Sequence, residues 1–96
     1  MKALFGESPQ PVAAQIPIAE VKKVEFYKIN ELTTDLICCH VSLVGGKSIL
    51  IHEDMDGWDR QIQRLTNLTA FDSDWFAKVS QPPFAPSNHV AFEAKL

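Results

Sequence analysis

The residues best suited to chemistry lie in one stretch, residues 35–56, which holds both cysteines and two of the three histidines. Cys38, His40 and His52 occupy even positions, so they would share one face of a sheet if this stretch forms a β-hairpin. Cross-strand neighbours lie about 5 Å apart, close enough for these side chains to bind one metal ion or for a histidine to activate a thiol. Asp54 has the same parity and would complete a set of four metal ligands.

Other features weigh against a catalytic or metal site. Neither a C-x-x-C nor an H-E-x-x-H spacing is present, and polar residues on the water-facing side of a sheet explain the same pattern. The chain also lacks a Walker loop, a G-x-S-x-G motif and an evident acid/base pair. We therefore expect no catalytic residue and no cofactor. A small metal-binding or thiol-dependent enzyme that uses Cys38, His40 and His52 is the alternative.

A cluster of four acids lies between Glu53 and Asp59. The string Asp54-x-Asp56-Gly57 matches part of a calcium-binding loop, but the further oxygen ligands and the terminal glutamate are missing. Asp56 has the residue type and position of a helix N-cap, and the neighbouring acids would lie at the positive end of the helix dipole. Helix capping is therefore the expected role of this cluster, rather than binding of Ca²⁺ or Mg²⁺.

Alternating apolar residues predict the strands that position these groups, over residues 21–29, 36–43, 47–54 and 88–96. In the second strand the odd positions from Ile37 to Leu43 are all apolar, and in the third strand so are Ile49 and Ile51. Both sets can share one face only if the hairpin loop has an odd number of residues. A three-residue loop, Val44-Gly45-Gly46, meets this condition, with glycine where left-handed dihedrals are required. Cys39 then points into the core and Cys38 away from it, so both are expected to be free thiols.

Two helices are expected between the third and fourth strands. Trp58, Ile62 and Leu65 recur at i, i+4 and i+7, and this spacing predicts an amphipathic helix over residues 57–65. A shorter helix is expected over residues 73–80, where Pro82 and Pro83 would end it.

Aromatic residues gather on these two helices. The second helix would begin with Asp72 as its cap and with Phe71 packed against Phe76 as a hydrophobic staple. Trp58 and Trp75 stand on the first and second helices, where indoles either fill the core or wall an apolar pocket. The core is the commoner position, and a small-ligand binder with a Trp58/Trp75 pocket is a further alternative.

The element order β-β-β-α-α-β predicts an α+β fold, an antiparallel four-stranded sheet with two helices packed on one face. Residues 21–96 would form this single domain, and residues 1–20, with three of the six prolines, an extended or partly disordered N-terminal arm. The second face of the sheet would be half apolar, through Leu36, Val44 and Leu50. This face and the modest core of so short a chain favour a non-catalytic domain that forms a homodimer or binds a protein partner.

The overall composition disfavours two other classes of partner. The net charge of -3 leaves no positive excess for nucleic-acid phosphates. No apolar run approaches the roughly 20 residues that span a bilayer, and residues 1–15 lack the apolar region of a signal peptide. With two free thiols, these features predict a cytoplasmic protein that binds neither nucleic acid nor membrane.

Four strings also carry a resemblance. TTDLICC, EDMDGWD, DWF and QPPFA, together with the alternating last strand, resemble a group of small uncharacterised bacterial proteins over residues 24–95. The resemblance implies a bacterial, cytoplasmic origin. It implies no activity, because that group has none assigned.

Overall fold

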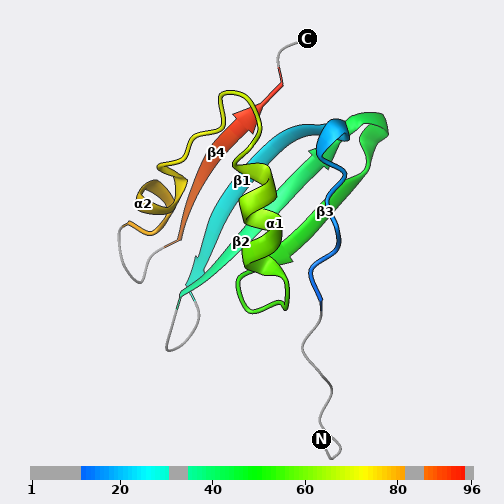
Figure 1. Ribbon diagram of the computed structural model, residues 1–96. Coiled ribbons are helices and arrows are strands. Elements are labelled where there is room, and N and C mark those ends of the chain that lie inside the picture. The colour runs from blue at the N-terminus through cyan, green and yellow to red at the C-terminus, as the bar shows by residue number, and fades with distance from the viewer. Residues whose placement is uncertain (1–11, 31–34, 82–85, 95–96) are drawn as a thin grey trace, which may run out of the picture.

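The strands and helices follow the predicted order along the chain (Figure 1). The computed structural model describes residues 12–30, 35–81 and 86–94. The α+β fold class is confirmed. The strands are β1 (Val21–Asn30), β2 (Asp35–Leu43), β3 (Ser48–His52) and β4 (Ser87–Glu93), the α-helices are α1 (Trp58–Leu65) and α2 (Trp75–Val79), and the 3-10 turns are η1 (Ile18–Glu20) and η2 (Val44–Gly46).

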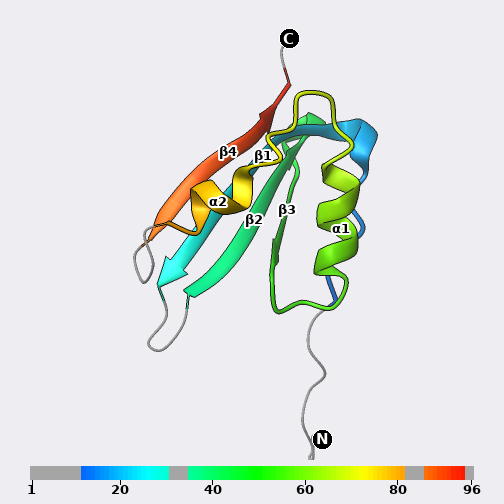
Figure 2. The ribbon, with the colours of Figure 1, turned by 60° about the vertical axis from the view of Figure 1, so that its left-hand side comes forward.

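The sheet has the strand order β3-β2-β1-β4, and all neighbouring strands are antiparallel. The first three strands form a meander, and β4 returns to the edge beside β1. Both helices lie on one side of this sheet (Figures 1 and 2), as the sequence predicted. We name the opposite side the open face, because no helix of the described residues covers it.

The hairpin between β2 and β3 confirms the three-residue loop. The Leu43 amide donates to the Lys47 carbonyl at 2.8 Å, which closes the loop around η2. Gly46 has φ 84°, the left-handed conformation that glycine adopts without a steric penalty. The pairing of Cys39 with Ile51 then places the odd positions of both strands on the helical side. The parity inferred from the apolar pattern is therefore correct.

The core lies between the sheet and the helices, with Phe26 of β1 at its centre. Phe26 stacks on Trp75 and meets Trp58 and Phe71 edge to face. Fully or almost fully buried apolar side chains surround this aromatic cluster. They include Val24, Ile37, Cys39, Val41, Ile51, Ile62, Leu65, Val79 and Ala91.

The described part of the N-terminal arm is fixed against the start of α1. The Ala13 amide donates to the Asp56 carbonyl at 2.7 Å, and the Ile16 amide donates to Oε1 of Gln61 at 3.0 Å. Ala13 and Ile16 are both buried in the hydrophobic core. Residues 12–20 therefore contribute to packing, and η1 leads directly into β1.

One buried cation joins the sheet to α2. Nζ of Lys28, on the core side of β1, donates to the Ser80 carbonyl at 2.8 Å and lies 3.6 Å from Oδ2 of Asp35. Only 3% of Lys28 is exposed. Its stem occupies core space while its ammonium group compensates a carbonyl at the end of α2.

Both helix starts differ from the prediction. α1 begins at Trp58 after Gly57, whose φ of 88° places a glycine at the cap position predicted for Asp56. The backbone carbonyl of Asp56 instead accepts a hydrogen bond from the Ala13 amide of the arm. α2 begins only at Trp75, because Asp72 uses its carboxylate to accept the Asp74 amide at 2.9 Å in the preceding turn.

The predicted aromatic staple is also absent among the described contacts. The ring of Phe71 meets Phe26, whereas the ring of Phe76 meets Trp75 and is largely exposed.

A β-bulge changes the expected faces of β4. Val24 pairs with Phe92 but Glu25 pairs with Val90, so Ala91 stands between the two pairs. Ala91 is buried in the core and Val90 is partly exposed on the open face. An uninterrupted alternation over residues 88–96 would put Val90, Phe92 and Ala94 together on one buried face, and the bulge shows that this expectation is wrong. The predicted Leu96 lies outside the described residues.

Candidate functional site

The open face carries the even-numbered residues of β2, as the sequence predicted. Cross-strand pairing arranges its side chains in rows from β3 to β4. The two central rows are Leu50, His40, Glu25, Val90 and His52, Cys38, Tyr27, Asn88; one flanking row is Ser48, Ser42, Lys23, Glu93, and the other pairs Leu36 with Ile29. The face is therefore apolar at one end and at parts of both edges, and polar elsewhere.

The four predicted metal ligands do not form one cluster. Cys38 stands directly opposite His52, whereas His40 is paired with Leu50 and Glu25 in the next row. Asp54 lies in the turn after β3, because that strand ends at His52, and its amide is 3.3 Å from Nδ1 of His52. Among the described residues, no three His, Cys, Asp or Glu side chains are placed to hold a metal ion.

Neither thiol is presented to solvent. Cys38 is only 4% exposed although it belongs to the open face, since Tyr27 and His52 flank it. Cys39 is fully buried, and this burial, with the neighbouring Cys38, raises the pKa of its thiol to about 12. Burial also raises the pKa of Tyr27, with a further contribution from Cys38. A thiolate nucleophile therefore has no support in this environment.

Large apolar side chains stand exposed on the open face. The exposed fractions are 44% for Ile29, 53% for Leu50 and 38% for Val90. Leu36, a predicted interface residue, is partly buried beside Ile29, whereas Val44 lies in η2 at the end of the hairpin. The predicted half-apolar character of this face is therefore present, and its exposed members include Ile29 and Val90, which were not among the predicted interface residues.

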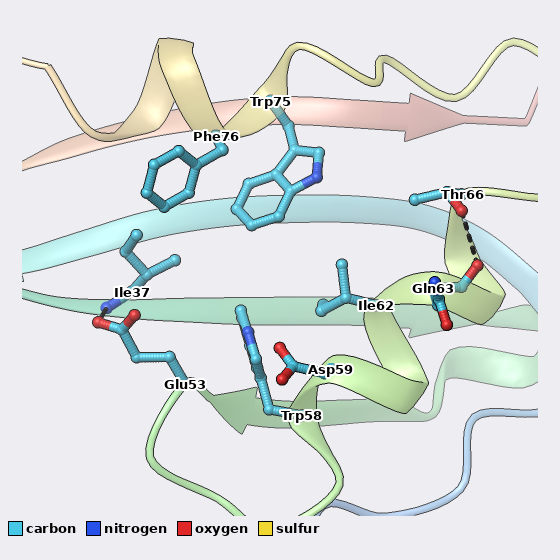
Figure 3. A pocket seen from close by; sticks show the side chains of 9 residues that line it. All are labelled: Ile37, Glu53, Trp58, Asp59, Ile62, Gln63, Thr66, Trp75 and Phe76. Carbon is cyan, nitrogen blue, oxygen red and sulfur yellow. Dashed lines mark hydrogen bonds between the residues drawn. The ribbon is translucent and has the colours of Figure 1, made fainter.

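A groove lies on the helical side of the sheet, between α1 and α2 (Figure 3). Its volume is about 550 Å³, and it is open to solvent. We name it the interhelical groove. Its walls and floor are the apolar and aromatic side chains of Ile37, Trp58, Ile62, Trp75 and Phe76. Both predicted pocket tryptophans line it, and each is only partly buried.

The polar lining of the interhelical groove is acidic or neutral. It consists of Glu53 and Asp59 together with Gln63 and Thr66. Glu53 directly follows β3 and lies beside the start of β2, where its Oε1 accepts the Ile37 amide at 3.0 Å and its own amide donates to the Ile37 carbonyl. Asp59 extends from the first turn of α1 beside Trp58 (Figure 3). Two carboxylates therefore border a groove whose other walls are mainly apolar and aromatic.

A cluster of polar side chains joins β4 to the segment before α2, and the sequence analysis did not predict it. The Asp72 carboxylate contacts Nζ of Lys78 at 2.6 Å and Nε2 of His89 at 2.7 Å. The hydrogen bond from Lys78, followed by those from the Asp74 amide and His89, lowers the pKa of Asp72 to about 2. This group has the character of a structural clamp, because each of its members pairs with another.

Comparisons with protein families, curated proteins and solved structures found no match to this chain. The resemblance to small bacterial proteins thus remains a prediction. In the described residues no helix is long and apolar enough to cross a membrane.

Proposed function

We propose that this chain is a non-catalytic domain that forms a homodimer through the open face of its sheet. The observation that carries this proposal is the exposure of Ile29, Leu50 and Val90 on a face that no described helix covers. Burial of apolar surface contributes roughly 25 cal/mol per Å², so covering the exposed parts of three such side chains on each subunit favours association.

The dimensions of the open face suit a second copy. Strands rise about 3.3 Å per residue and lie about 4.8 Å apart, so a four-stranded face of this kind covers roughly 500 Å² in plan. Its accessible surface is larger because side chains stand up from it, and stable interfaces bury about 800 Å² per partner. Two such faces would pack about 10 Å apart, as sheets do in sandwiches.

The charges on the open face favour a copy of the same chain over a strongly charged partner. Lys23 stands in the same row as Glu93 and next to Glu25 on its own strand face. A two-fold axis places the same face of both copies against each other. A face that carries charges of both signs can then pair its positive groups with the negative groups of the other copy. A face of a single sign would instead select an oppositely charged partner.

Analytical ultracentrifugation over a range of protein concentrations tests this function. The wild-type chain is expected to sediment as a dimer at high concentration and to dissociate on dilution. Leu50→Lys and Val90→Lys should each shift the equilibrium to monomer, because they place a cation in the interface. Val12→Lys is the matched control, since Val12 is exposed but lies in the arm rather than on the open face.

Two results would overturn the homodimer. One is a wild-type mass that stays monomeric at every concentration. The other is a dimer that survives both lysine substitutions on the open face while circular dichroism shows that the variants are folded.

A further inference from the structure

We propose that the interhelical groove binds a small organic cation, an ammonium group carried on an apolar or aromatic body. This site is separate from the proposed homodimer, because the groove and the open face lie on opposite sides of the sheet (Figures 2 and 3). The groove volume of about 550 Å³ falls within the range of roughly 300–1,000 Å³ typical of small-molecule sites.

The charge of the lining selects the sign of the ligand. Glu53 and Asp59 both border the groove, and none of its lining residues is Lys, Arg or His. An anion would meet two carboxylates with no compensating positive charge, whereas a cation meets two opposite charges. The net charge of -3 on the whole chain acts in the same direction.

The aromatic walls select a cation with an apolar body. Among aromatic rings, indole attracts ammonium groups most strongly, and Trp58 and Trp75 both line the groove. Ile37 and Ile62 add an aliphatic surface that a fully hydrated metal ion would leave unused. The combination of carboxylates with indoles therefore fits an organic amine better than an inorganic cation.

The walls of the groove are already in position before a ligand enters. Trp75 stacks on Phe26 with ring centroids 3.8 Å apart, and Trp58 meets both rings edge to face. Glu53 is held by its two hydrogen bonds to Ile37. A preformed site loses little conformational entropy on binding, which favours affinity for a small ligand.

Three probes of similar shape and different charge test the proposal: phenethylammonium, 2-phenylethanol and phenylacetate. Tryptophan fluorescence and backbone amide NMR shifts report binding at the groove. Phenethylammonium is expected to bind about tenfold more tightly than the alcohol, and phenylacetate to bind least. Equal affinity for the amine and the alcohol, tighter binding of phenylacetate, or no binding of any probe at millimolar concentration would each overturn it.

Charge-neutralising variants locate the effect. Glu53→Gln and Asp59→Asn should each weaken phenethylammonium binding about five- to tenfold and leave binding of 2-phenylethanol unchanged. Glu93→Gln on β4 and Asp56→Asn before α1 remove the same charges outside the groove, and should leave both affinities unchanged. A loss as large in the controls as in the groove variants, or no loss in either groove variant, contradicts the assignment.

The same titration separates this inference from the homodimer. Val90→Lys changes the open face only, so this variant should bind phenethylammonium with wild-type affinity whether or not it dimerises. A wild-type chain that is monomeric but binds the amine supports the groove proposal and contradicts the homodimer. A wild-type chain that dimerises but binds no amine supports the homodimer and contradicts the groove proposal.

Discussion

Trp75 of α2 lies parallel to Phe26 of β1, with an angle of 10° between the rings and 3.8 Å between their centroids. This stack fixes α2 to the centre of the sheet, although the helix has only five residues. A helix of that length has almost no stability of its own in water. The aromatic contact therefore holds α2 in place and sets the width of the interhelical groove.

Phe26→Ala should destabilise the protein by about 3–5 kcal/mol, because it removes a fully buried ring and the support for three aromatic neighbours. Phe76→Ala is the control, since Phe76 meets the ring of Trp75 edge to face and is 55% exposed. Its cost should stay below about 1 kcal/mol. Urea unfolding followed by tryptophan fluorescence measures both, and similar losses in the two variants would show that the stack does not anchor α2.

Lys28→Ala should cost about 2–4 kcal/mol in the free energy of unfolding, because it leaves the Ser80 carbonyl and the Asp35 carboxylate without this cation. Lys22→Ala makes the same change at an exposed position of the same strand and should be nearly neutral. Thermal unfolding of the two variants compares them. A loss confined to Lys22→Ala, or equal in both, would contradict the role assigned to Lys28.

Asp72→Asn should weaken the dependence of stability on acid. The carboxylate has a pKa of about 2 in the folded protein, below the value of 3.8 for an unperturbed aspartate. The unfolded chain therefore binds more protons between about pH 4 and pH 2, and the stability that Asp72 contributes above that range is lost as the pH falls through it.

Urea unfolding at a series of acidic pH values measures this effect. The stability difference between wild type and Asp72→Asn should be largest above about pH 4 and should shrink towards pH 2. Asp56→Asn, which removes an exposed carboxylate elsewhere, serves as the control. A difference that does not change with pH, or that changes equally in the control, would rule out this assignment.

The buried thiols should react only when the protein opens. With its pKa raised to about 12, the Cys39 thiol has a thiolate fraction roughly a thousandfold below that of a free cysteine at neutral to mildly alkaline pH. Labelling of Cys38→Ser with Ellman's reagent isolates Cys39. Release of the coloured product should be slow in buffer and immediate in denaturant, and rapid labelling of the native protein would contradict the burial.

The hairpin could be predicted from sequence because the odd positions that face the core are apolar in both of its strands. Apolar residues such as Ile37 and Ile51 must reach the same core, and a one-residue slip would expose one of the two sets. This local rule gave the loop length and the face of Cys39. It could not give the burial of Cys38, which depends on the cross-strand neighbours Tyr27 and His52.

The faces of β4 could not be predicted from alternation, because a bulge interrupts the alternation in this strand. The pairing of Glu25 with Val90 and of Val24 with Phe92 shifts the strand by one residue. A bulge of this kind is set by the partner strand, and its signal in the sequence of β4 is weak. The pairing of His89 with Asp72 likewise joins residues that are 17 apart, so no spacing motif marks it.

The interhelical groove was only partly visible in the sequence. Trp58 and Trp75 were identifiable as aromatic residues on two helices, but their distance depends on how each helix packs on Phe26. Glu53 and Asp59 were interpreted together with Asp54 and Asp56 as capping acids. The conformation of the turn that connects β3 to α1 places Glu53 and Asp59 at the groove and Asp54 and Asp56 outside it.

The position of β1 between β2 and β4 also has a consequence for how the chain folds as it is synthesised. β2 can pair with β1 soon after both emerge, but Glu25 and Asn88 are 63 residues apart in the chain. The edge of β1 that pairs with β4 therefore keeps unpaired backbone groups until β4 has been synthesised. The Ile16 amide likewise lacks its hydrogen-bond acceptor until Gln61 has been made, 45 residues later. A chain that ends before β4 would keep one edge of β1 unpaired, and an unpaired strand edge favours aggregation.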